Sequence, residues 1–157
     1  MAKLWETQDD LDREAAVVAV YAKIKGCEYE KLPIQYKADY AFLRDEDLKA
    51  LVEIRCRNVS HDKYDTIMLS LLKWHDVNAM ARAINVPAMF VVRYTDGIYS
   101  IPLREMPDEI TMGGRALMRD ARDRELVVHY KVDRMRFVAD VDGGCRETFD
   151  KGDRNGG

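Results

Sequence analysis

The chain has 157 residues, of which 47% are hydrophobic and 34% are charged. This length and composition fit one globular domain and exclude a chain that is disordered throughout. The sequence contains no apolar run of about 20 residues and no basic segment followed by an apolar one, so we expect no membrane span and no signal peptide. The net charge of −3 gives no sign of a nucleic-acid partner across the whole surface.

The cysteines and the chain ends give the next expectations. Cys27, Cys56 and Cys145 are odd in number, widely spaced and free of any CxxC pair. This pattern favours free thiols in a reducing compartment over a disulfide framework or a zinc site, so we expect a cytoplasmic protein. We expect residues 1–140 to form one domain. Residues 141–157 lose the apolar periodicity and are predicted to form a flexible tail.

The first half of the chain predicts a helix followed by a hairpin. Apolar residues recur at helical spacing over residues 11–25, and Gly26 is placed to end that helix. Loose alternation over 34–43 predicts a strand, and clean alternation over 48–57 predicts a second one. The charged residues 44–47 between them are typical of a tight turn, so the two strands are predicted to pair.

The second half predicts another helix and several strands. Helical spacing returns over residues 66–85. The predicted core face of that helix carries Ile67, Leu71, Trp74, Ala81 and Ile84. An apolar run over 88–94 predicts a buried strand, and Asp96-Gly97 predicts a turn into a second strand. Residues 104–125 look irregular, and strand patterns return after them. This order predicts an α/β fold: a central mixed β-sheet flanked by α-helices.

Two acidic residues in the predicted hairpin carry the chemical signal. Asp39 interrupts an apolar strand, where burying an unpaired carboxylate is costly. Glu53 and Arg55 are two residues apart, so they share one face of their strand, whereas Ile54 faces the core. If the strands are neighbours, Asp39 and Glu53 converge. Two carboxylates beside a cation are what a Mg²⁺ site acting on a phosphodiester requires.

This layout resembles the PD-(D/E)xK nuclease superfamily, whose core is a helix, a hairpin-like strand pair, a helix and another strand. The superfamily includes restriction endonucleases, phage exonucleases and archaeal Holliday-junction resolvases. More closely, the chain resembles a group of small phage-encoded proteins assigned to it. The matching stretches are VEIRCR, IMLSLLKWHDV, PAMFVVRYTDGIY and GGRALMRDARDRELVV, within residues 11–138.

The resemblance implies a metal-dependent deoxyribonuclease with a restriction-endonuclease-like core. It makes Asp39 and Glu53 ligands of Mg²⁺, with Mn²⁺ as a substitute, the Ile54 carbonyl a third ligand and Glu14 an acid beside the metal. Arg55 stands where the motif usually has lysine, and arginine cannot act as a general base. Some superfamily members carry the missing lysine on the following helix, where this chain has Lys73.

The same resemblance implies DNA as the partner and a role in phage replication, recombination or repair, in the cytoplasm of a bacterial host. We predict that Arg57, Lys63, Arg115 and Arg119 contact DNA. A homodimer is consistent with this, because junction-cutting relatives use two-fold symmetry. No membrane partner is expected.

Each residue also has a structural explanation that the sequence leaves open. Glu53 and Arg55 fit the solvated face of an edge strand, and Asp39 fits a turn or strand-end acid paired with Lys37 or Arg55.

Other charged groups are equally ambiguous. Glu14 fits a first-turn helix acid, and Lys73 fits a lysine on an amphipathic helix. The segment 113–115 is either a phosphate-binding nest or a turn. The histidines show no metal-ligand spacing. The alternative function is a nuclease-fold module, catalytically weak or inactive, that binds DNA or a host protein.

Overall fold

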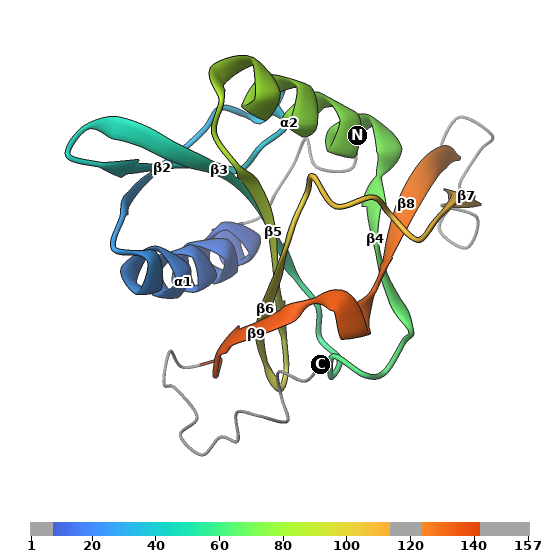
Figure 1. Cartoon of the computed structure of the whole chain (residues 1–157). Coiled ribbons are helices and arrows are strands. Elements are labelled where there is room, and N and C mark those ends of the chain that lie inside the picture. The colour runs from blue at the N-terminus through green and yellow to red at the C-terminus, as the bar shows by residue number, and fades with distance from the viewer. Residues whose placement is uncertain (1–7, 114–123, 142–157) are drawn as a thin grey trace.

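The computed structural model describes residues 8–113 and 124–141 (Figure 1). The helices are α1 (Gln8–Lys25) and α2 (Leu71–Ile84), and short 3-10 helices lie at Ile34–Tyr36 and Val132–Arg134. The strands are β1 (Glu28–Lys31), β2 (Tyr40–Arg44), β3 (Asp47–Cys56), β4 (Thr66–Ser70), β5 (Ala88–Tyr94), β6 (Gly97–Pro102), β7 (Glu109–Gly113), β8 (Glu125–Lys131) and β9 (Arg136–Ala139). Neither of the two described helices is long and apolar enough to cross a membrane.

Six strands form the larger sheet, in the order β1-β2-β3-β5-β6-β9. The hairpin of β2 and β3 is antiparallel, β3 and β5 run parallel, and the remaining pairs are antiparallel. The parallel pair requires a crossover, and β4 and α2 lie in that connection. The predicted fold class, a central mixed sheet flanked by helices, is therefore confirmed.

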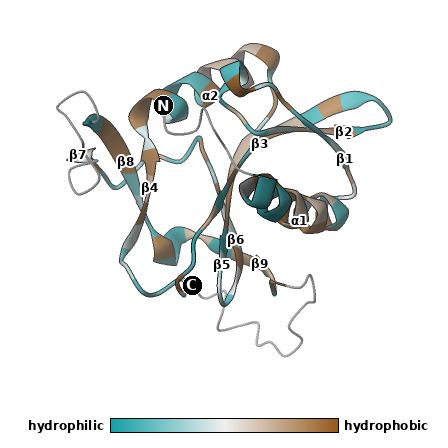
Figure 2. Ribbon diagram, turned by 180° about the vertical axis from the view of Figure 1, so that it is seen from behind, coloured by the Kyte–Doolittle hydropathy of each residue, from teal (hydrophilic) through white to brown (hydrophobic). Residues whose placement is uncertain are grey.

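Helix α1 covers one face of the larger sheet (Figures 1 and 2). Its buried residues, Val17, Val18, Tyr21 and Ala22, pack in one cluster with side chains of β2, β3, β5 and β6. Gly26 ends the helix at φ +68°, a conformation that glycine adopts without a steric penalty. The helix begins at Gln8 rather than at residue 11, but it lies where the apolar spacing predicts it.

The opposite face of the larger sheet, which we call the α2 face, packs against α2 and a second sheet. That sheet has the order β4-β8-β7 and was not expected from the sequence. Ile67 and Leu69 of β4, with Val77 and Ala81 of α2, share a buried cluster with strand residues from both sheets. Figure 2 shows much of β8, the middle strand of the small sheet, as hydrophobic.

Two predicted boundaries were wrong. The strand predicted over 34–43 begins only at Tyr40, because Pro33 and Lys37, at φ +67°, flank a 3-10 helix. The helix predicted over 66–85 begins at Leu71, because Thr66–Ser70 is strand β4, and Ile67 reaches the core from that strand. Ile84, predicted to face the core, is 45% exposed.

Besides β4, two strands escaped prediction. β1 has an all-exposed EYEK sequence, and β7 lies within the segment predicted to be irregular. The single domain over residues 1–140 stays a prediction. Most of the predicted tail, from residue 142 on, lies outside the described residues.

Candidate active site

Asp39 lies immediately before β2 and joins that strand to β3. Its backbone N–H donates to the Val52 carbonyl at 3.1 Å, and its carboxylate Oδ2 accepts the Ile54 N–H at 2.8 Å. The last residue pair between β2 and β3 on this side is Tyr40 with Val52. The N–H of Ile54 lies beyond that pair, so it needs a hydrogen-bond partner other than β2. Since the N–H and C=O of one strand residue point to the same side, the Ile54 carbonyl is expected on the Asp39 side.

Glu53 is a buried carboxylate on the α2 face of β3. Its neighbours Val52 and Ile54 point into the α1 cluster, so alternation turns Glu53 the other way. Its side chain is only 2% exposed, and its Oε1 has no hydrogen-bond partner among the described residues. Burial and the nearby Asp39 charge raise the pKa of Glu53 from 4.5 to about 8, against the opposing effect of Lys73.

Lys73 supplies the cation that meets Glu53. It lies in the first turn of α2, where the Ser70 hydroxyl caps the helix by accepting the Lys73 N–H at 3.4 Å. Its Nζ is 2.9 Å from the Glu53 Oε2. Burial alone lowers the pKa of Lys73, but Glu53 and Asp39 outweigh it and the net shift is upward. The ammonium therefore stays charged at the edge of the buried carboxylate.

Arg55 lies two residues beyond Glu53, on the same face of β3. It is half-buried, and its Nη1 donates to the Met68 carbonyl of β4 at 3.4 Å. The solvated-edge explanation for Glu53 and Arg55 is wrong, because β3 lies inside the sheet and Glu53 is buried.

Lys31, which sequence reasoning missed, lies between Asp39 and Glu14. Its Nζ is 3.9 Å from the Asp39 Oδ1 and 3.5 Å from the Glu14 Oε1. The pairing of Asp39 with Lys37 or Arg55 is thus not what the structure shows. Glu14 is connected to Asp39 through this ammonium. The available signal was weak, because Lys31 ends a short strand whose residues are all exposed.

The residues predicted to contact DNA lie in different places. Arg57 follows β3 directly and is half-buried. Lys63 is exposed on the loop before β4, with its Nζ 5.9 Å from the centre of the Tyr64 ring. Arg115 and Arg119 lie outside the described residues, as does most of the 113–115 segment.

A second cluster of side chains of the kinds that bind metals was not expected from the sequence. Among the described residues, His61, Asp62 and Asp96 bring ligand atoms within 4.8 Å of one another. The His61 Nδ1 is 2.7 Å from the Asp96 Oδ2, and the Asp96 Oδ1 accepts the His61 N–H at 2.9 Å. The Tyr99 hydroxyl also lies 3.1 Å from the His61 Nδ1. These groups already satisfy one another.

The side chains around Asp39 and Glu53 fit a divalent cation. Asp39 and Glu53 offer carboxylate oxygens, which hard cations prefer, and the Glu53 Oε1 is a buried acceptor without a partner among the described residues. A bound cation would satisfy that oxygen. It would also offset the mutual repulsion of the two carboxylates, which contributes to the raised pKa of Glu53.

The comparisons with known proteins concern the fold and the family. The structure of Hjc, a Holliday junction resolvase from the archaeal hyperthermophile Archaeoglobus fulgidus, superposes with a TM-score of 0.55 over 87% of this chain and 98% of that one. The superposition shows a shared fold, and at 12% identity it shows nothing beyond the fold. No curated protein matches the sequence. A family described as "Phage putative PDDEXK endonuclease" matches residues 1–138, so the chain belongs to this nuclease family.

Proposed function

We propose that the chain is a Mg²⁺-dependent deoxyribonuclease that hydrolyses DNA phosphodiester bonds in phage replication, recombination or repair. Family membership and the resolvase-like fold support a nuclease. One observation carries the metal dependence: Glu53 is buried beside Asp39 with an oxygen that no described residue satisfies. A carboxylate in that state is suited to a cation.

Asp39 and Glu53 would hold the ion, with Mn²⁺ able to replace Mg²⁺, and the Ile54 carbonyl is placed to assist. When bound, a divalent ion supplies Lewis acidity and makes a coordinated water a better nucleophile. Glu14 would act at most indirectly, because Lys31 lies between it and Asp39.

Lys73 and Arg55 would serve the phosphate. Both are cations next to Glu53 on the α2 face, and both contribute to the electrostatic balance of its carboxylate. Arginine offers a fixed pair of donors for phosphate oxygens, and an ammonium offers a compact charge. Lys73, supplied by α2, would replace the lysine that is absent at Arg55. Together they would stabilise the charge that develops on the phosphate in the transition state.

The remaining parts of the proposal concern context. DNA is the proposed partner, bound by a homodimer, and the proposed place is the cytoplasm of a bacterial host. The protein with the similar fold, Hjc, is a Holliday junction resolvase. A four-way junction is therefore one of the substrates to compare.

The test is cleavage of labelled single-stranded, duplex and four-way-junction DNA with Mg²⁺ or Mn²⁺. We expect cutting that EDTA abolishes and that Asp39→Ala removes while the circular dichroism spectrum is unchanged. Cutting that survives EDTA would contradict the metal dependence. A folded protein that binds DNA and cuts none of the substrates would favour the binding module instead.

A further inference from the structure

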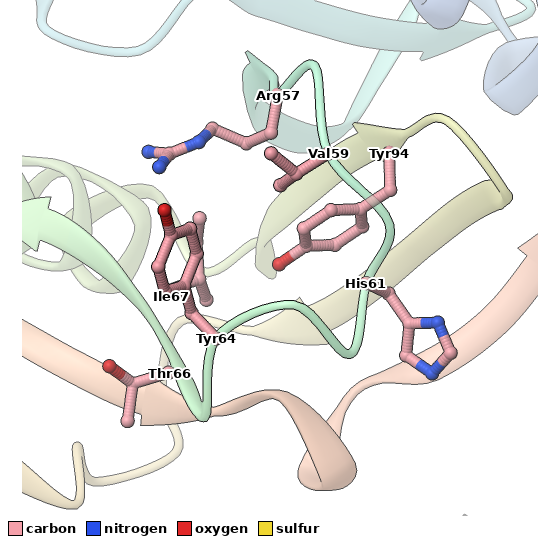
Figure 3. Close-up of a pocket in the computed structure, with 7 residues that line it drawn as sticks. All are labelled: Arg57, Val59, His61, Tyr64, Thr66, Ile67 and Tyr94. Carbon is pink, nitrogen blue, oxygen red and sulfur yellow. The ribbon is translucent and has the colours of Figure 1, made fainter.

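A narrow pocket lies beyond Arg55, where the loop after β3 meets the end of β5 (Figure 3). Its walls include Arg57, Tyr64, Thr66 and Tyr94, and we call it the Arg57 pocket. Figure 3 shows the side chains of Arg57, Tyr64 and Tyr94 on one side of the loop and the His61 ring turned to the other. None of these residues belongs to the proposed metal site.

The Tyr94 hydroxyl is a buried donor that no described residue binds. The residue is 3% exposed, and its hydroxyl has no hydrogen-bond partner among the described residues. Burial raises the pKa of Tyr94 to about 12, so the hydroxyl keeps its proton at neutral pH. Buried hydroxyls in folded proteins nearly always have a partner, and an exception calls for an explanation.

Arg57 makes the electrostatic environment of this hydroxyl positive. No ion pair involves its guanidinium within the described ranges 8–113 and 124–141. Of the charges that act on Tyr94, Arg57 is stronger than Asp96, and Arg55 adds to it. The nearby acids are engaged elsewhere, Asp96 with His61 and Asp62 with the Ser60 hydroxyl. The pocket thus offers a donor and a cation to an anion.

The size of the pocket limits what can enter it. The space open to a water-sized molecule measures about 10 Å³, which is close to the least that one water molecule needs. One phosphate oxygen has a similar size. The rest of a phosphate would stay at the mouth, where Tyr64 is 55% exposed and the Lys63 ammonium lies over its ring. An exposed tyrosine beside cations is also a surface on which a base can stack.

The position of the pocket relates it to the proposed active site. Glu53 and Arg55 alternate along β3, and Arg57 follows directly with its N–H still bound to the Arg93 carbonyl of β5, so the three are expected to share the α2 face and to follow one another at roughly 7 Å. That spacing is comparable to the separation of successive phosphates along a nucleic-acid strand. A strand whose scissile phosphate lies at Glu53 and Lys73 could therefore continue past Arg55 to the Arg57 pocket.

We infer that the Arg57 pocket binds a phosphate of the DNA strand that flanks the scissile bond, with the Tyr94 hydroxyl donating to one phosphate oxygen and Arg57 pairing with its charge. This inference rests on the proposed function, because the strand is the one that Asp39 and Glu53 would act on. The pocket would fix the register of the strand without reading its bases.

The first experiment measures DNA binding in EDTA, where no cleavage can occur, by fluorescence anisotropy over a range of salt concentrations. Arg57→Gln should weaken binding about tenfold and reduce the salt slope by roughly 0.7 to 0.9. Tyr94→Phe removes only the oxygen and should weaken binding about threefold to fivefold with an unchanged salt slope. Matched controls are Arg93→Gln, a half-buried arginine that alternation turns to the other sheet face, and Tyr29→Phe in β1.

The second experiment locates the phosphate. Single methylphosphonates, which are neutral, are placed along the strand, and one flanking position should lose affinity in the unmodified protein and not in Arg57→Gln. In parallel, inorganic phosphate is titrated while the side-chain NMR signal of ¹⁵N-labelled Arg57 is followed. The signal should shift in the unmodified protein and shift less in Tyr94→Phe.

The outcomes separate this inference from the proposed function. If DNA is cut but Arg57→Gln and Tyr94→Phe bind it as their controls do, the pocket inference is overturned and the nuclease stands. If phosphate shifts the Arg57 signal less in Tyr94→Phe than in the unmodified protein but no DNA is cut, phosphate binding at the Arg57 pocket stands and the proposed function falls. If neither phosphate nor DNA responds to the two variants, the inference is overturned.

Discussion

Two groups of carboxylates lie near β3, and they differ in how far their neighbours satisfy them. Glu53 belongs to the strand, Asp39 binds its Ile54 amide, and a buried Glu53 oxygen has no partner among the described residues. Asp62 and Asp96 lie beyond its end, on a loop and a turn, where His61 and Ser60 already bind them. The second group meets a simple distance criterion for a metal site, whereas the first has the unsatisfied acceptor.

The contrast shows why a count of nearby acids is a weak indicator of function. Exposed carboxylates and a histidine can form an internally hydrogen-bonded cluster on a loop at little cost. Holding Glu53 at 2% exposure beside Asp39 is costly, as the upward pKa shift of Glu53 shows, and the Lys73 ammonium in contact with it offsets part of that cost. This cost favours Asp39 and Glu53 over the His61 cluster as the proposed metal site.

The largest expected effect separates the two groups by cleavage. Glu53→Gln removes a proposed ligand charge at nearly constant volume, and it should lower the cleavage rate by at least about 100-fold. Asp96→Asn makes the same chemical change in the other cluster and should leave the rate within about twofold of the unmodified protein. Rates are measured at saturating Mg²⁺ on the preferred DNA substrate. The reverse ranking of the two variants would move the metal to His61.

The next effect concerns the cation that α2 brings to the site. Lys73→Gln should reduce cleavage about 100-fold, because it removes a charge aimed at the position where the phosphate would gain negative charge. Lys49→Gln, on the exposed part of β3, changes the net charge equally and should have little effect. Equal rates for the two variants would leave Lys73 as a structural partner of Glu53 only.

A smaller effect tests metal binding without catalysis. Mg²⁺ at ten times its Kd should stabilise the fold by about 1.4 kcal/mol, which corresponds to roughly 4 °C in Tm for a chain of this size. Glu53→Gln should abolish this shift, and Asp96→Asn should keep it. Differential scanning calorimetry with Mg²⁺ or EDTA measures both. Loss of the shift in Asp96→Asn alone would show that the exposed cluster holds the ion.

The sequence predicts the first group of carboxylates because its determinants are local. Alternation in β3 and a charged turn are enough to predict the hairpin, and the hairpin brings Asp39 next to Glu53. Buried β5 and the helix of Lys73 also follow from short patterns. The ion pair between Lys73 and Glu53 could be suggested only through the resemblance, since no local rule connects residues 20 positions apart.

The missed features depend on distant partners. β4 continues directly into α2, so Ile67 and Leu69 look like the start of a helix, and the strand is defined only by pairing with β8 about 60 residues later. Lys31 belongs to a strand without an apolar face. His61 meets Asp96 across 35 residues, and only the folded structure shows that the buried Tyr94 hydroxyl has no partner among the described residues. Tertiary pairing, which local pattern cannot supply, decides each case.

The smallest predicted effect lies in the exposed cluster and concerns stability at low pH. Burial acts to raise the pKa of Asp96, but hydrogen bonds from the His61 ring and backbone outweigh it, so the pKa lies below 3.8. A carboxylate with a lowered pKa in the folded state contributes stability above 3.8, and that contribution disappears as the pH falls through the folded pKa.

Asp96→Asn should therefore remove part of the acid-dependent loss of stability. The change should be below about 1 kcal/mol, because the group is partly exposed and screened by solvent. Urea unfolding at pH 6 and pH 3 gives the difference, with Asp62→Asn as the neighbouring control. If Asp96→Asn shows the same pH dependence as the unmodified protein, His61 does not stabilise the ionised Asp96 carboxylate. The difference proposed between the Asp96 cluster and the pair of Asp39 and Glu53 would then be contradicted.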